Sequence, residues 1–241
     1  MQLLIIRHAE PDYSIDSLTE KGWREAEALS KYMEHVPVNE FYVSPLGRAQ
    51  DTASLTLKRL NKTATTLPWL KEFPARVKHL DRPNELHAAW DWLPEDWANN
   101  PMFYDVNNWY KHPIFEEANV KEIYDDVIKN FRSFLKDHGY EKLGNTYKVL
   151  NSNHDTICFF CHFGIECVLL SDLFSVSPMT LWHDLAAAPS SISSIYTEER
   201  KEGTASFRMN YFGSTTHLYL ANEEPSFMAR FAECYKDDND H

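Results

Sequence analysis

An unbroken apolar run near the N-terminus, residues 3–6, constrains the fold of this chain more than any other stretch. A short run of this kind suits a strand that is buried on both faces of a parallel sheet. A cation and an imidazole, Arg7 and His8, follow it at once. Because ligands bind at the carboxyl edge of the strands in an open α/β sheet, this pair is a candidate site if other polar residues reach the same edge.

Apolar runs alternate with amphipathic stretches through most of the remaining chain. Further strands are predicted at residues 41–43, 63–70, 156–161, 192–197 and 206–211. Pro68 interrupts one of them and therefore places it at an edge of the sheet. Strands that alternate with helices predict an α/β fold with three layers, in which a mostly parallel sheet carries helices on both faces.

Five helices are expected between and after these strands. Thr19 is the expected N-cap of the first helix. Its inward face would hold Trp23, Ala26, Leu29 and Met33. Ser44 is the expected N-cap of the second, with Pro45 at its first position. The other three are predicted at residues 120–139, 164–173 and 228–235.

Residues 73–115 break the pattern. They hold Trp90, Trp92, Trp97 and Trp109 among several prolines and acids, without a clean period. We interpret the chain as a single domain, residues 1–241, with a partly helical insertion at 73–115. Two roles for the insertion remain open, a cover over a site and a stabilising surface subdomain.

Four polar residues each follow a predicted strand: His8, Arg48, Glu72 and His162. They can therefore converge on one edge of the sheet. With Arg7 they form a set suited to phosphoryl transfer. The planar fork of arginine matches phosphate oxygens, a neutral imidazole can attack phosphorus, and a protonated carboxyl can give its proton to the leaving oxygen.

The same residues lie in motifs that resemble the histidine phosphatase superfamily, also called phosphoglycerate-mutase-like. The motifs are Arg7-His8-Ala9-Glu10, Leu18-Thr19-Glu20-Lys21-Gly22, Ser44-Pro45-Leu46-Gly47-Arg48-Ala49-Gln50-Asp51-Thr52-Ala53, Leu70-Lys71-Glu72 and His162-Phe163-Gly164-Ile165. They occur in the family's order over most of the chain outside the insertion.

The resemblance implies a role for each of the five residues. His8 resembles the nucleophile that becomes phosphohistidine, and His162 the second histidine of the pocket. Arg7 and Arg48 resemble the phosphate clamps. Glu72 resembles the proton donor, in a stretch that matches the family less well.

Three departures from the family pattern bear on the pocket. Ala9 and Phe163 each stand where the family commonly has glycine. The loop between Glu10 and Leu18 is short and lacks the asparagine that binds phosphate in many members. The pocket is therefore expected to lack one phosphate donor.

The net charge and the apolar pattern of the chain exclude some classes of binding partner. The net charge of −12 argues against nucleic acid, which requires a basic surface. No apolar stretch is long enough to span a membrane, and the N-terminus lacks the basic region of a signal peptide. We therefore expect a cytoplasmic protein with reduced cysteines, and the oligomeric state stays open.

No cofactor and no metal are expected. Cys158-Phe159-Phe160-Cys161-His162 matches the haem-attachment pattern C-x-x-C-H, but in a buried strand the two cysteines would point to opposite faces. The remaining histidines form no H-x-H or H-E-x-x-H pattern.

The sequence favours a metal-independent phosphatase that hydrolyses a small phosphomonoester through phosphohistidine. Two alternatives stay open, a phosphoglycerate-mutase-type transfer and a non-catalytic phosphate-binding module. Three cations after Glu72 are candidates for holding the distal part of an anionic substrate, or are an ordinary solvated surface: Arg76, Lys78 and Arg82.

Overall fold

The computed structural model describes residues 1–228, and an eight-stranded sheet forms its centre. Strand β1 (Gln2–Arg7) lies inside this sheet and pairs in parallel with β10 (Thr156–Cys161). Beyond β10, the parallel strands β4 (Glu40–Val43) and β5 (Thr65–Thr66) complete this half of the sheet. The carboxyl ends of these four strands therefore meet at one edge, as the sequence predicts.

The other half of the sheet is antiparallel. It consists of β11 (Ile192–Lys201), β12 (Thr204–Ser214), β9 (Thr146–Val149) and β8 (Tyr140–Leu143), in that order outward from β1. Strands β11 and β12 were both predicted, and in the structure they form an antiparallel hairpin. Gly203, at φ +79°, lies in the tight turn between them, whereas parallel strands would need a longer crossover connection. The short pair β8 and β9 was not predicted.

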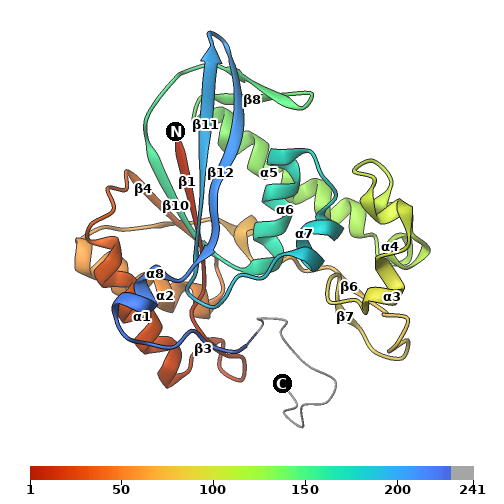
Figure 1. The fold of residues 1–241 in the computed structure, drawn as a ribbon, viewed down its shortest axis with the longest axis horizontal. Helices are drawn as coiled ribbons and strands as arrows, with labels where there is room; N and C mark the ends of the chain where they lie inside the picture. Colours follow the sequence, from red (N-terminus) through yellow and green to blue (C-terminus); the bar gives the residue numbers. More distant parts are fainter. Residues whose placement is uncertain (229–241) are drawn as a thin grey trace.

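Helices cover both faces of the sheet, which confirms the predicted α/β layering (Figure 1). One face carries α1 (Glu20–Met33), α2 (Gly47–Leu60) and the short α8 (Thr216–Leu220). The other carries α5 (Val120–Asp137), α6 (Phe163–Phe174) and α7 (Pro178–Asp184). Cys158 and Cys161 lie in the apolar clusters of opposite faces, as the strand period requires.

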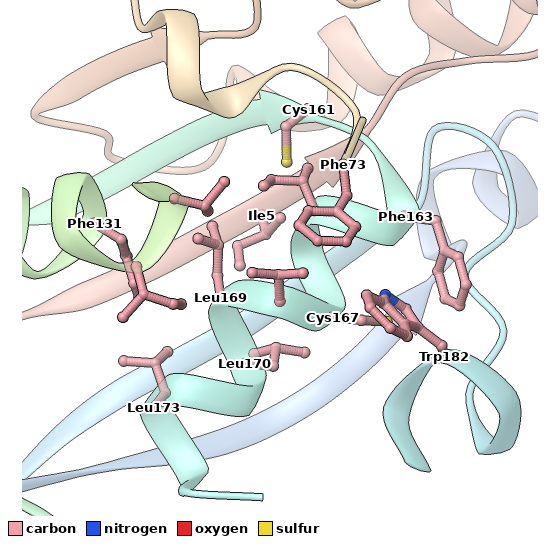
Figure 2. Close-up of a cluster of buried hydrophobic side chains, with 14 of the residues drawn as sticks. Ile5, Phe73, Phe131, Cys161, Phe163, Cys167, Leu169, Leu170, Leu173 and Trp182 are labelled. Atoms are coloured by element: carbon pink, nitrogen blue, oxygen red, sulfur yellow. The ribbon is translucent and has the colours of Figure 1, made fainter. Parts of the chain in front are cut away.

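Helix α6 is anchored in the larger of these clusters. Its residues 163–173 are all buried, and Figure 2 shows Leu169, Leu170 and Leu173 packed around its axis, with Ile5 of β1 above them. Burial of each large apolar side chain contributes about 1.5–3 kcal/mol. The N-terminal turn of α6, directly after His162, is therefore held rigidly.

Two details of the first helices differ from the prediction. Thr19 caps α1 as expected, through a hydrogen bond that its side chain accepts from Gly22 N, but Trp23 is 37% exposed and does not join the inward face. Helix α2 begins at Gly47 with Leu46 as N-cap, so the prediction that Ser44 caps it is wrong. The Ser44 hydroxyl accepts from Leu46 N and lies against a histidine instead.

The Trp-rich segment, residues 73–115, is partly helical as predicted. It contains a small ribbon of β6 (Arg76–Val77) and β7 (His87–Ala88), followed by α3 (Pro94–Trp97), η2 (Pro101–Tyr104) and η3 (Trp109–Lys111). The segment ends within α4 (Pro113–Glu117). Trp92, Phe103, Trp109 and Phe115 form its buried aromatic centre. The edge strand predicted at 63–70 keeps only residues 65–66, because Pro68 begins the short η1 (Pro68–Leu70).

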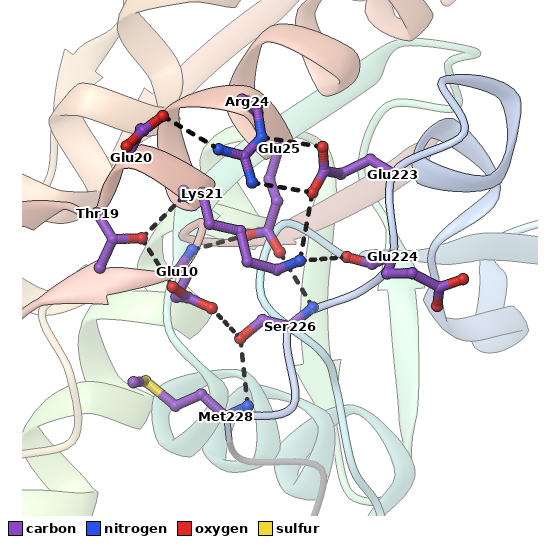
Figure 3. A network of polar contacts seen from close by, with 11 residues as sticks. Glu10, Thr19, Glu20, Lys21, Arg24, Glu25, Glu223, Glu224, Ser226 and Met228 are labelled. Atoms are coloured by element: carbon purple, nitrogen blue, oxygen red, sulfur yellow. Dashed lines mark hydrogen bonds and ion pairs between the residues drawn. The ribbon is translucent and has the colours of Figure 1, made fainter.

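Residues 223–228 return to the loop that follows His8 (Figure 3). The Ser226 hydroxyl donates to a Glu10 carboxylate oxygen, and Ser226 N donates to Glu25 Oε1 at 3.2 Å. Burial, opposed by hydrogen bonds from Glu10 N and Ser226 N, raises the pKa of Glu25 to about 7. The loop between Glu10 and Leu18 also forms the ribbon of β2 (Pro11–Asp12) and β3 (Ser17–Leu18).

The helix predicted at 228–235 lies, beyond Met228, outside the described residues. Among the helices that are described, none combines the length and apolar character needed to cross a bilayer.

Candidate active site

The structure brings the five predicted residues to one edge of the sheet. Arg7 ends β1 and His8 follows it, while His162 follows the neighbouring strand β10. The parallel pairing continues past the strand ends, since His8 N donates to Cys161 O at 2.9 Å. As a result, the rings of His8 and His162 lie 5.1 Å apart between centroids.

His8 is buried and held in one tautomer. Its Nδ1 lies 2.8 Å from Ala9 O, so Nδ1 carries the proton and donates it to this carbonyl. Burial, reinforced by the Arg7 charge, lowers the pKa of His8 well below 6.5. The ring is therefore neutral at pH 7, with the lone pair on Nε2 available to an electrophile.

His162 is also neutral and buried. Burial lowers its pKa well below 6.5, and the positive charges of Arg48 and Arg7 lower it further. Its Nε2 lies 2.7 Å from the Ser44 hydroxyl, and its Nδ1 has no partner among residues 1–228. Ser44 thus orients this ring, a role that the sequence analysis missed because it assigned Ser44 to a helix cap.

The two arginines are positioned from different elements. Arg7 is buried, donates from Nη1 to Ala187 O at 2.5 Å, and lies 5.9 Å from the Phe163 ring. Arg48, in the first turn of α2, pairs through Nη1 with Asp16 Oδ1 at 2.5 Å. The Nε atoms of both guanidinium groups are buried and make no hydrogen bond to the described residues. A bound anion would satisfy donors of this kind.

Glu72 lies at the N-terminus of α6. Its Oε1 accepts from Phe73 N at 2.8 Å and from Ile165 N at 3.0 Å. Burial raises its pKa, although these hydrogen bonds and the Arg7 charge oppose the shift. A carboxyl in this position is more readily protonated than a solvated one and can donate a proton.

Three further residues around the site were not identified from the sequence. Asp16 accepts from Gly47 N at 2.7 Å as well as from Arg48, and thereby ties the loop after His8 to α2. Tyr13 lies over Arg48, 5.4 Å from its guanidinium carbon. Glu166 is buried in α6, and burial raises its pKa to about 8. These are contacts between loops and helix faces, and no local sequence signal predicts them.

The three cations of the Trp-rich segment have nearby partners. Arg76 donates to Leu86 O at 3.0 Å, and Lys78 lies 3.4 Å from a Glu117 oxygen. Arg82 pairs with Asp81 at 2.9 Å. Within residues 1–228, no group of three or more His, Cys, Asp or Glu side chains is arranged to hold a metal ion.

Three solved structures that share this fold are described as phosphatases. Phosphoserine phosphatase from Entamoeba histolytica, in an H9A mutant complexed with phosphoserine, aligns over 90% of this chain and 98% of its own, with a TM-score of 0.57 and 16% identity. The α-ribazole phosphatase from Shigella flexneri aligns over 89% of this chain and 97% of its own, with a TM-score of 0.53 and 21% identity. A mycobacterial glucosyl-3-phosphoglycerate phosphatase aligns over 88% of this chain and 98% of its own, with a TM-score of 0.56 and 16% identity.

At the level of sequence, the chain is similar to 2,3-bisphosphoglycerate-dependent phosphoglycerate mutase from Thermoplasma acidophilum. The two are 34% identical over 73 residues, which is 26% of this chain and 36% of that relative. The profile of the histidine phosphatase superfamily (branch 1) matches residues 3–209, which include all five residues at the edge of the sheet. This protein therefore belongs to branch 1 of the histidine phosphatase superfamily.

Proposed function

We propose that the protein is a phosphatase that hydrolyses small phosphomonoesters through a phosphohistidine on His8. The observation that carries this proposal is the state of His8. The ring is neutral, buried and fixed by its Nδ1 donation to Ala9 O, with its other nitrogen available beside two arginines. An imidazole in this state is a competent nucleophile toward phosphorus.

The first half-reaction transfers the phosphoryl group to the enzyme. His8 Nε2 forms a bond to phosphorus as the bond from phosphorus to the leaving oxygen breaks, and Glu72 gives its proton to that oxygen. Arg7 and Arg48 offset the charge on the phosphoryl oxygens. A pair of unit charges about 4 Å apart interacts by roughly 4 kcal/mol at an effective dielectric of 20, enough to outweigh a diffuse negative surface.

The second half-reaction uses water. The Glu72 carboxylate, deprotonated by the first step, takes a proton from water as the water oxygen attacks phosphorus. The bond from His8 Nε2 to phosphorus breaks, phosphate leaves, and Glu72 is again protonated. His162, oriented by Ser44, lies beside His8 throughout and can contact the transferring group.

Hydrolysis is favoured over mutase-type transfer by the charges around the site. A mutase binds a substrate with two anionic groups, and this requires cations beyond the phosphate clamps. Arg76, Lys78 and Arg82 are instead engaged with a carbonyl or with carboxylates of the chain. A non-catalytic phosphate-binding module is disfavoured, because both histidines and Glu72 are present together.

Incubation with 3-phosphoglycerate and a trace of 2,3-bisphosphoglycerate separates hydrolysis from mutase transfer. We expect free phosphate and little 2-phosphoglycerate, because water reaches the phosphohistidine before a reoriented product does. Both products are followed by phosphorus NMR. Rapid formation of 2-phosphoglycerate with little phosphate release would show that the protein is a mutase.

Chelation tests the role of the arginines. If Arg7 and Arg48 supply the positive charge, the rate of hydrolysis of nitrophenyl phosphate should change by less than about twofold after dialysis against EDTA. A loss of more than tenfold that one added metal restores would contradict this prediction. Nitrophenolate release at 405 nm is a sufficient readout.

A further inference from the structure

Gly164, in the first turn of α6, marks the point where the Trp-rich segment reaches Glu72. A Cβ added to Gly164 would lie 2.7 Å from Glu72 Oε1 and 2.4 Å from Trp90 Cη2. The Glu72 carboxyl and the six-membered ring of Trp90 therefore both border the space beside Gly164 in which a methyl group would lie. A larger residue at position 164 would displace one of them, so glycine is what admits Trp90 to the site.

Trp90 is fixed in this position by its neighbours. Its ring packs on Trp182, with 5.8 Å between centroids, and Trp182 is itself fixed by donation from Nε1 to Gly164 O at 3.0 Å. The preceding residue, Ala89, is buried and donates from its backbone N to Ala75 O at 3.1 Å. Trp90 nevertheless stays only half-buried, so part of the indole is accessible beside Glu72.

This placement bears on the leaving group, under the proposed function. The oxygen that receives the Glu72 proton must come within hydrogen-bond reach of that carboxyl. The carbon skeleton bonded to it then lies in the neighbourhood of Trp90. An indole offers a wide apolar surface and favours flat or apolar partners, with about 0.5–1.5 kcal/mol for an aromatic pair beyond burial alone.

The Trp-rich segment offers no net positive charge to a second anionic group on the leaving side. The Trp-rich segment holds six acids and four bases, and its cations nearest in sequence to Glu72, Arg76 and Lys78, contact Leu86 O and Glu117. A second aromatic side chain stands at the phosphate side, since Tyr13 is 63% exposed and lies over Arg48. Trp90 and Tyr13 therefore each present a partly accessible aromatic ring at the site.

We propose that Trp90 is a specificity-determining residue, and that it selects phosphomonoesters whose alcohol is uncharged and aromatic over those whose alcohol carries a carboxylate. This inference rests on the proposed phosphatase activity. It assigns to the Trp-rich segment a direct contact with the leaving group.

Three primary alkyl esters of similar intrinsic reactivity test the inference: benzyl phosphate, cyclohexylmethyl phosphate and 3-phosphoglycerate. For the wild-type protein we expect kcat/KM to be at least about tenfold higher for benzyl phosphate than for 3-phosphoglycerate. Trp90→Ala should lower kcat/KM for benzyl phosphate by about tenfold, mainly through KM. The same substitution should change kcat/KM for 3-phosphoglycerate by less than about threefold. A tenfold change corresponds to about 1.4 kcal/mol.

Two further variants separate contact from folding. Trp90→Phe keeps an aromatic ring and should retain most of the preference for benzyl over cyclohexylmethyl phosphate. Tyr104→Ala removes an exposed aromatic ring from the same segment and should leave the substrate order unchanged. Thermal melting of each variant reports whether the Trp-rich segment remains folded.

Each outcome has a distinct meaning. Faster turnover of 3-phosphoglycerate than of benzyl phosphate would overturn the inference and leave the phosphatase proposal intact. If Trp90→Ala lowered kcat/KM equally for all three esters, Trp90 would only support the fold. Absence of hydrolysis for every ester, nitrophenyl phosphate included, would overturn both the inference and the proposed function.

Discussion

Replacement of His8 by asparagine should abolish turnover while the fold persists. The asparagine side-chain amide can still donate to Ala9 O, as His8 Nδ1 does at 2.8 Å, but it has no nitrogen lone pair that can attack phosphorus. Loss of a covalent nucleophile removes the intermediate itself. We therefore expect a fall in kcat on the order of 10⁴-fold or more, as for other enzymes that lose their nucleophile.

Acid quench makes the His8 prediction specific. During turnover of a ³²P-labelled ester, the wild-type protein should carry an acid-labile phosphoryl group, which mass spectrometry of peptides prepared at alkaline pH should place on His8. The His8→Asn variant should carry none. His35 is exposed just beyond the C-terminal end of α1, so His35→Asn is the matched control and should keep the wild-type rate and the label. Wild-type turnover by His8→Asn would exclude covalent catalysis at this residue.

The parts of the site predicted from sequence are those that lie next to a strand end. Residues 3–6 and 156–161 are unbroken apolar runs, and an unbroken run specifies a strand buried on both faces. Once two such strands pair in parallel, the residues just after them, His8 and His162, are brought together by the sheet itself. No long-range information beyond that pairing is needed.

The parts that were missed depend on contacts between distant loops. Asp16 reaches Arg48 across 32 positions, and Trp90 reaches Glu72 only because Gly164 leaves room between them. The Trp-rich segment has no clean period because its aromatic side chains pack on one another rather than on a flat sheet. The hairpin of β11 and β12 shows a related limit, since strand direction is set by the connection and not by the strand's own residues.

Glu72→Gln should slow the hydrolysis of alkyl phosphates far more than that of nitrophenyl phosphate. Glutamine keeps an oxygen that can accept from Phe73 N and Ile165 N, so the first turn of α6 should remain in place. It cannot supply the proton that an alkoxide leaving group needs. General acid catalysis contributes about 10²–10⁴-fold, so we expect a loss in that range for benzyl phosphate and only a few-fold loss for nitrophenyl phosphate, whose phenolate leaves without a proton.

The pH dependence of the hydrolysis rate is a second test of Glu72 as the proton donor. Burial raises the pKa of Glu72, so the protonated and active form persists at higher pH than for a solvated carboxyl and is lost as the pH rises through that pKa. The rate on benzyl phosphate should therefore fall on the basic side in the wild-type protein, and this fall should be absent from Glu72→Gln. Glu85 pairs with His87 at 3.4 Å and is largely exposed, so Glu85→Gln is the matched control. If Glu85→Gln instead showed the loss that depends on the leaving group, and Glu72→Gln lost equally on both esters, the proton would come from the Trp-rich segment and Glu72 would serve only to hold α6.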